Sequence, residues 1–345
     1  MAAALLLAGA LLASVPVHGY ELGMGYPLPW GSVVAGGYAT VRAGHLDGVP
    51  EKAAVEDLSL FLSGGIVPRW RFFTELELGN PVVWRNGGPT IADAEFHVER
   101  LYLDHSLTPR ASLRLGKFLT PIGRWNLIHA EPLVWSIFRP LTTASAFARN
   151  ASGAELIGTR SLTASELEYR LWADDSQALD RAPGGDETYL DAPVEPNPPN
   201  LFNQAGGLRL CWRALDDDLQ IGLSSALFNL RQRDGNRVLV GTDLFYRHAA
   251  WELTGEAVYR WGTNGAGDEW GGFAQVAAPL GGGLYAVLSG ERFKAEGYDR
   301  ATDSARVGLA WRPKPALTVK IEYQESGGEE ELAPDGWLFS ISALF

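Results

Sequence analysis

The sequence contains little cysteine, methionine or lysine, and its charge is mainly negative. Cys211 is the single cysteine among 345 residues, which excludes a disulfide-stapled fold and a zinc or iron–sulfur site built from cysteines. The 41 acidic residues outnumber the 29 basic ones, and the net charge of −12 argues against a general nucleic-acid-binding protein. The motifs of phosphate-binding loops, zinc proteases and haem attachment are absent, and no serine stands in a nucleophile-elbow context. We therefore expect no enzyme activity, no metal and no cofactor.

Long apolar runs are also absent, except at the start of the chain. Residues 2–17 are rich in Ala and Leu, but at roughly 15 residues the run is short for a membrane-spanning helix, which needs about 20. It ends in Val17-His18-Gly19, with small or β-branched residues as at a signal-peptidase site, although no Lys or Arg precedes it. We interpret residues 1–19 as a signal peptide, with a buried N-terminal helix as the alternative, and expect residues 20–345 to form one domain.

Alternation of apolar and polar residues recurs along the rest of the chain. The stretches 251–261 and 317–323 are two examples, in which every second residue is apolar or aromatic. Side chains of a strand point to opposite faces in turn, so this period of two predicts strands. Sixteen are expected, at about 32–44, 54–64, 68–79, 95–105, 110–118, 151–159, 161–173, 204–213, 218–230, 236–247, 250–261, 270–278, 283–293, 304–312, 316–325 and 336–345.

The linkers distinguish a membrane barrel from a soluble β-sandwich, because both show the same alternation. Long linkers follow the odd-numbered strands and short linkers follow the even-numbered ones. Short turns at one end and longer loops at the other are typical of outer-membrane barrels, in which apolar residues face lipid and polar residues face a wet lumen. The sequence therefore predicts an all-β, antiparallel, up-and-down transmembrane barrel of about sixteen strands.

Aromatic residues are expected to form two girdles where the barrel meets the membrane interfaces. The candidates all fall in the apolar phase near strand ends, although large residues at the strand ends of a sandwich core would give the same pattern. They are Trp212, Tyr246, Trp251, Tyr259, Trp261, Trp270, Trp311, Tyr323 and Trp337.

Two stretches resemble a known family. The chain ends on Phe345, in the manner of Gram-negative outer-membrane barrels, and residues 113–126 contain Gly116-Lys117-Phe118-Leu119-Thr120-Pro121-Ile122-Gly123. This segment resembles the "G-[KR]-F-x-T-P-x-G" of the phosphate-selective porin O and P-like group. The resemblance implies a sixteen-stranded channel, often a homotrimer, for small polar solutes, with Phe345 as a signal for the barrel-assembly machinery. With only five lysines in the sequence, selectivity for phosphate itself is not expected.

The third long linker, residues 119–150, carries many apolar side chains and is expected to fold into the barrel as a constriction loop. Arg114, Lys117, Arg124 and Arg139 surround the single acid Glu131, and we predict that these five residues line the narrowest point. The alternative is that the arginines only pair with wall acids such as Glu75, Glu77 or Glu155. The acidic linkers 174–203 and 326–335 are expected to be solvated or to bridge lipopolysaccharide through divalent cations.

Two functions remain open. The first is an outer-membrane porin for passive diffusion of small polar or anionic solutes, in contact with membrane lipid and lipopolysaccharide. The second is a barrel without a channel, which would be structural or adhesive, lipase-like, or a sheath for an electron-transfer partner. Single-channel conductance would distinguish the two.

Overall fold

The computed structural model describes residues 23–29, 32–85, 88–91, 93–128, 130–179, 201–231, 233–263, 266–328 and 332–345. The expected signal peptide, residues 1–19, lies outside these ranges. So do His129 of the segment that resembles the porin family and most of the acidic linker 174–203. Within the described ranges no helix has the length and apolar character needed to cross a membrane.

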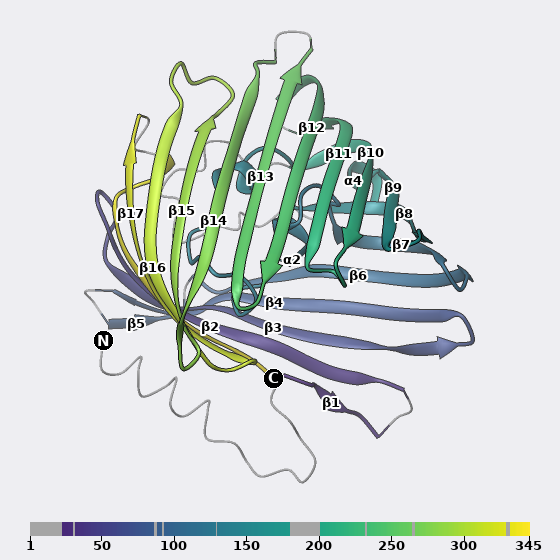
Figure 1. Ribbon diagram of the computed structural model, residues 1–345, viewed down its shortest axis with the longest axis horizontal. Coiled ribbons are helices and arrows are strands. Elements are labelled where there is room, and N and C mark those ends of the chain that lie inside the picture. Colours follow the sequence, from purple (N-terminus) through teal and green to yellow (C-terminus); the bar gives the residue numbers. More distant parts are fainter. Residues whose placement is uncertain are drawn as a thin grey trace.

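Sixteen antiparallel strands form one closed barrel (Figure 1). Pairing of the last strand with the first, from Gly336↔Leu46 to Leu344↔Tyr38, completes the circle. The barrel strands are β2 (Val34–Leu46), β3 (Lys52–Val67), β4 (Trp70–Arg85), β6 (Glu95–Thr108), β7 (Ala111–Leu119), β8 (Asn150–Ser161), β9 (Ser165–Asp174), β10 (Phe202–Ala214), β11 (Leu219–Leu230), β12 (Arg233–His248), β13 (Trp251–Gly262), β14 (Glu269–Gly281), β15 (Leu284–Lys294), β16 (Thr302–Lys314), β17 (Leu317–Gly327) and β18 (Gly336–Leu344). The short strands β1 (Tyr26–Pro27) and β5 (Gly88–Thr90) pair with β2 and β4. Each predicted strand has its counterpart, so the sixteen-stranded barrel is confirmed.

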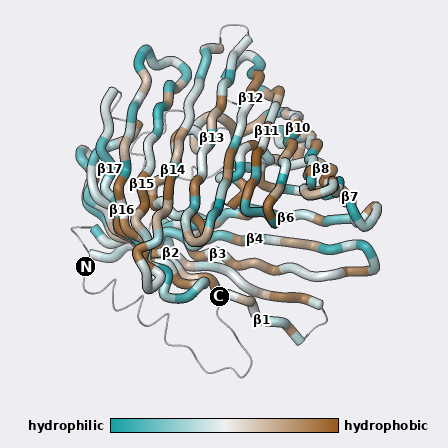
Figure 2. Tube along the Cα trace, in the orientation of Figure 1, coloured by the Kyte–Doolittle hydropathy of each residue, from teal (hydrophilic) through white to brown (hydrophobic). Residues whose placement is uncertain are grey.

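Burial along the strands is inverted relative to a soluble protein. On β13, Leu253 and Tyr259 are exposed, whereas Glu256 and Arg260 are buried; on β17, Ile321 is exposed and Lys320 is buried. The apolar phase therefore faces outward and the polar phase faces inward, which is the arrangement expected of a barrel in lipid. Figure 2 shows hydrophobic residues along β14–β16 and hydrophilic residues toward their long-loop ends.

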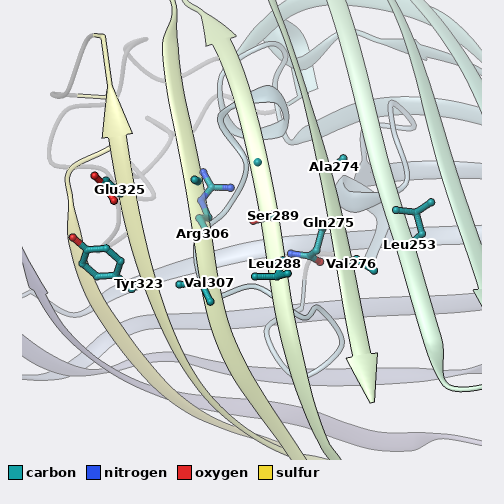
Figure 3. A pocket seen from close by; sticks show the side chains of 12 residues that line it. Leu253, Ala274, Gln275, Val276, Leu288, Ser289, Arg306, Val307, Tyr323 and Glu325 are labelled. Atoms are coloured by element: carbon teal, nitrogen blue, oxygen red, sulfur yellow. The ribbon is translucent and has the colours of Figure 1, made fainter. Parts of the chain in front are cut away.

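One row of the outer face shows how register builds the apolar surface. Cross-strand pairing aligns Leu253, Val276, Leu288, Val307 and Tyr323 on β13 to β17. These five side chains line a shallow groove together with smaller residues such as Ala274, Gly290 and Ala305 (Figure 3). The groove follows from small residues lying beside large ones in successive rows of the same face.

Short and long connections alternate around the barrel as the sequence predicts, except after β11. Tight turns need unusual backbone angles: Ala249 has a φ of 52°, and Leu215, Asp216 and Asp217 have φ values of 54°, 54° and 71°. One difference concerns the connection after β11. It was expected to span residues 231–235, but β12 begins at Arg233, where the ladder shifts register, so the connection is shorter.

In the described part of the chain, three single-turn helices lie outside the strands. They are α2 (Trp125–Ile128), α3 (Leu141–Ala144) and α4 (Ser176–Leu179). The first two belong to the connection between β7 and β8, which we call the loop segment and define as residues 120–149. Because isolated helices this short are unstable in water, contacts with the barrel must hold them.

Candidate functional site

Glu131 joins the loop segment to three strands. Its carboxylate accepts hydrogen bonds from Lys320 Nζ at 2.8 Å, Ser340 Oγ at 2.9 Å and Arg42 Nη2 at 3.3 Å. Glu131, Lys320 and Arg42 are all buried. The Lys320 ammonium group also donates to the carbonyl oxygens of Glu131 at 2.9 Å and Ser136 at 3.2 Å. A buried charge requires such pairing, so Glu131 is an anchor for the segment.

Four carboxylates of the wall hold the segment at other points. Glu256 accepts from the backbone N–H groups of Arg124 at 2.8 Å and Trp125 at 2.5 Å. Glu252 accepts a hydrogen bond from Trp135 Nε1 at 2.7 Å, and Glu322 accepts one from the backbone N–H of Ile137 at 2.9 Å. Glu291 accepts from both the backbone N–H and the hydroxyl group of Thr142, at 2.8 Å each. Sequence reasoning did not single out these acids. The signal was available, since each is a Glu in the polar phase of a strand.

The apolar side chains of the segment pack against other parts of the chain. Ile122 and Phe147 are buried in one cluster with Trp172, Phe202 and Phe228 from β9, β10 and β11. The ring centroids of Trp172 and Phe202 are 5.9 Å apart, and those of Phe202 and Phe228 are 5.1 Å apart. This packing explains why a connection of this length carries so many apolar residues.

Arg124 and Arg139, both predicted to line the constriction, lie on the segment and are half-buried. The Arg124 guanidinium carbon lies 3.9 Å from the centre of the Phe245 ring, and Arg139 Nη2 donates to Asn126 Oδ1 at 3.1 Å and to the Thr143 carbonyl at 3.0 Å. Burial lowers the pKa of the Arg124 guanidinium, and the nearby carboxylates, chiefly Glu252, oppose that shift. The site therefore holds two cationic side chains on a tightly anchored segment.

The structure does not bring Arg114 and Lys117 together. On β7, Arg114 lies opposite Asp104 and Glu155, whereas Lys117 lies opposite Leu101, whose side chain is exposed on the outer face. Residues three apart on a strand fall on opposite faces, so Lys117 belongs to the outer phase. Glu131 was predicted to line the narrowest point, but its side chain is instead buried against the basic groups of Arg42 and Lys320.

A row of arginines lies on the inner wall of the barrel. We call Arg100, Arg114, Arg170 and Arg213, on β6, β7, β9 and β10, the arginine row. Each pairs with a carboxylate, in contacts from 2.5 to 3.4 Å: Arg100 with Glu75, Arg114 with Asp104 and Glu155, Arg170 with Glu155 and Glu168, and Arg213 with Glu168.

Exposure differs between the two partners of these pairs. The four arginine side chains are 17–29% exposed, whereas those of Glu75, Glu155 and Glu168 are 1%, 0% and 9% exposed. The exception is Asp104, which at 27% is more exposed than its partner Arg114 at 17%; at the other pairs the guanidinium group is more exposed than the carboxylate. The alternative considered from the sequence, pairing of arginines with wall acids, is correct for Arg114 and Glu155.

The fold and this interior define a closed, antiparallel, sixteen-stranded barrel of the porin type, with an apolar exterior and an ionic interior. No protein-family model matches the chain. An uncharacterized protein of Aquifex aeolicus (strain VF5) is 24% identical over 211 residues, which are 57% of this chain and 44% of that protein. The match thus spans less than half the length of this curated relative.

Solved structures share the fold over most of their length. They include an anion-selective porin from Comamonas acidovorans, 12% identical with a TM-score of 0.63, covering 91% of this chain and 99% of that one. Salmonella typhi OmpF in complex with daunomycin is 11% identical with a TM-score of 0.62, and the coverages are 91% and 98%. The in-vitro folded trimer form of OmpT, an outer membrane protein of Vibrio cholerae, is 10% identical with a TM-score of 0.57, and the coverages are again 91% and 98%. At such identities the likeness shows the fold. The finer resemblance to the phosphate-selective group stays a prediction.

Proposed function

We propose that this chain is a porin of the bacterial outer membrane that forms a water-filled channel for passive diffusion of small polar or anionic solutes. The observation that carries the proposal is the inverted burial pattern. Large apolar residues such as Leu223, Leu227 and Ile321 are exposed, whereas Arg209, Arg260 and Arg306 are buried on the opposite phase. A barrel of this kind is stable in lipid with its polar groups inside.

We infer that the loop segment lies inside the barrel and narrows the channel. Its partners, including Glu256, Glu322, Lys320 and Ser340, belong to the inward phase of their strands. The bonds reach β2, β13, β15, β17 and β18, and we propose that the passage runs between the segment and the inner wall that carries Arg100 and Arg114. A polar lumen with a constriction selects solutes by size and charge.

The cationic groups of this passage support a preference for anions. Arg124 and Arg139 are half-buried cations of the segment, and Arg100, Arg114, Arg170 and Arg213 are partly exposed cations of the wall. Charges farther than about 10 Å from the narrowest point are largely screened at ~0.1 M salt, so the net charge of −12 does not set the selectivity.

The test is the reversal potential of single channels in a planar bilayer across a KCl gradient. We expect a modest preference of the wild type for chloride, and loss of that preference with a higher conductance in Arg124→Ala/Arg139→Ala. Arg292→Ala is the matched control, because Arg292 is exposed on the outer face beside Asp303. A cation-selective wild type, or a double variant with unchanged reversal potential, would show that Arg124 and Arg139 do not govern permeation.

A second candidate function is a plugged barrel without a channel, and one observation favours it. The cluster that includes Ile122, Phe147 and Phe202 fills part of the interior with apolar side chains. A plugged barrel would give no discrete conductance steps in the bilayer experiment. A porin would give steps whose size scales with KCl concentration.

The partners of the chain are part of this proposal. OmpT of similar fold has a trimer form, and we infer a homotrimer for this chain as well. We further propose contacts with outer-membrane lipid and lipopolysaccharide and assembly through Phe345. The mass of the folded protein in detergent tests the trimer, and a monomer at all concentrations would exclude it.

A further inference from the structure

Four aromatic rings run across neighbouring strands on the inner face of the barrel. Tyr38, Phe61, Phe73 and Tyr102 come from β2, β3, β4 and β6, and successive ring centroids lie 5.8, 5.9 and 5.3 Å apart. Their phase is the inward one, because the outward neighbours of Phe61 and Tyr102 are the exposed Leu60, Leu101 and Leu103. Phe61, Phe73 and Tyr102 are only half-buried, so part of each ring is accessible.

Arg100 lies among these rings. Its guanidinium carbon is 4.6 Å from the centre of the Phe73 ring and 5.8 Å from that of Phe61. Its Nε donates to Glu75 Oε2 at 2.5 Å, but its two Nη groups bond to none of the residues that the structure describes. Arg114, by contrast, uses Nε, Nη1 and Nη2 on Asp104 and Glu155. Arg100 is therefore the member of the arginine row with a fork open to a ligand.

A guanidinium fork binds a carboxylate through two parallel hydrogen bonds, and aromatic rings bind a flat apolar body by offset or tilted stacking. We propose that Arg100, Phe61 and Phe73 form a binding site for small monocarboxylates that carry an apolar ring. The proposal deepens the channel function and rests on it, since the site would lie on the wall of the passage. It names the class of solute that the passage retains and transfers.

The surrounding charges favour a monoanion over a phosphate dianion. Glu75 lies against Arg100, and Glu77, on the same face of β4, accepts from Ser59 Oγ at 3.1 Å and Tyr38 OH at 3.4 Å. A second negative charge on the ligand would meet these carboxylates at short range. The open guanidinium fork of Arg100 and the adjacent rings of Phe61 and Phe73 therefore match a ligand with one carboxylate and one apolar ring.

The experiment measures binding of radiolabelled benzoate to the folded full chain in detergent micelles by equilibrium dialysis, with protein-free micelles as the blank. Unlabelled benzoate should compete at a concentration at least about tenfold lower than unlabelled acetate, because acetate offers the carboxylate without the ring. In Phe73→Leu this preference should fall by roughly three- to tenfold. Phe72→Leu is the matched control: Phe72 pairs with the exposed Leu103 on the outer face, and the preference should stay as in wild type.

Variants at Arg100 separate the fork from simple charge. Arg100→Lys keeps the positive charge but loses the fork, and should weaken benzoate binding while the protein stays folded. Glu75→Gln/Arg100→Gln removes both charges of the Arg100–Glu75 pair and should abolish specific binding of radiolabelled benzoate. The heat-dependent shift in electrophoretic mobility of folded barrels reports that each variant folds.

The outcomes are distinguishable from those of the channel proposal. Equal competition by benzoate and acetate, or a Phe73→Leu variant that behaves as wild type, would overturn the site. KCl conductance in bilayers is measured separately. Selective benzoate binding without conductance would support the binding site and contradict the channel function. Conductance without selective binding would support the channel function and contradict the binding site.

Discussion

The bond between Glu131 and Lys320 gives the sharpest stability prediction, because both groups are buried and each has few other partners. If the glutamate becomes glutamine, the Lys320 ammonium keeps two backbone carbonyls, at 2.9 and 3.2 Å, but loses its counter-charge. Removal of one partner from a buried pair costs about 3–5 kcal/mol. We expect about 3 kcal/mol for Glu131→Gln, the low end, since the carbonyls remain.

The reverse change should cost a similar amount. In Lys320→Met, the Glu131 carboxylate keeps Ser340 Oγ at 2.9 Å and Arg42 Nη2 at 3.3 Å, and Arg42 also binds Glu56 at 2.7 Å. We again expect about 3 kcal/mol. In the double variant neither charge is left alone, so its cost should be close to that of one single change. The double-mutant cycle should therefore show a coupling of about 2–3 kcal/mol.

The assay is urea unfolding in lipid vesicles followed by tryptophan fluorescence, with the free energy of unfolding compared for all four proteins. Lys314→Met is the control, because Lys314 is exposed at the end of β16 and its loss should change stability by less than about 0.5 kcal/mol. If the costs of the two single changes simply add in the double variant, Glu131 and Lys320 do not act as a pair and the anchor is elsewhere.

Three further predictions concern the lipid face, the terminus and the acid response. Ile321→Arg on the outer face should cost roughly 2–4 kcal/mol in folding into liposomes, whereas Thr159→Arg on the inner face should be far milder, and equal costs would contradict the inverted assignment. Deletion of Phe345, whose backbone pairs with Gly37 at 2.9 Å in both directions, should reduce membrane-inserted protein in cells, and unchanged insertion would remove its role in assembly. Burial raises the pKa of the Glu296 carboxyl group and the hydrogen bond from Arg237 lowers it, and the net shift is downward. The ionised carboxylate therefore stabilises the folded protein at pH values above its ordinary pKa, and this stabilisation is lost as the solution becomes more acidic. Glu296→Gln should therefore cost about 1–2 kcal/mol at pH 7, and the difference from wild type should shrink below about pH 4; a constant difference would refute the charge argument.

Local patterns account for what could be predicted of the fold. The alternation in stretches such as 251–261 defines a strand and its two faces without knowledge of any partner, because the period of two is a property of the extended backbone. The lengths of the linkers then give the up-and-down order. The opposite faces of Arg114 and Lys117 follow from the same rule, since three positions separate them, so the prediction that both line the constriction was wrong for Lys117.

The partners of each charge could not be predicted in this way. Glu131 and Lys320 are 189 positions apart, and Trp125 and Glu256 are 131 apart, so their contacts depend on closure of the whole barrel and on how the loop segment packs against it. From the sequence, Glu131 is one acid among several arginines; in the structure it is buried, and burial makes pairing with Lys320 and Arg42 necessary. The sequence by itself determined the number of strands and the alternation of an apolar with a polar face, because these are local properties of the chain. Only the tertiary structure decided which cations remain open to solutes, because that depends on which carboxylates lie within hydrogen-bond reach.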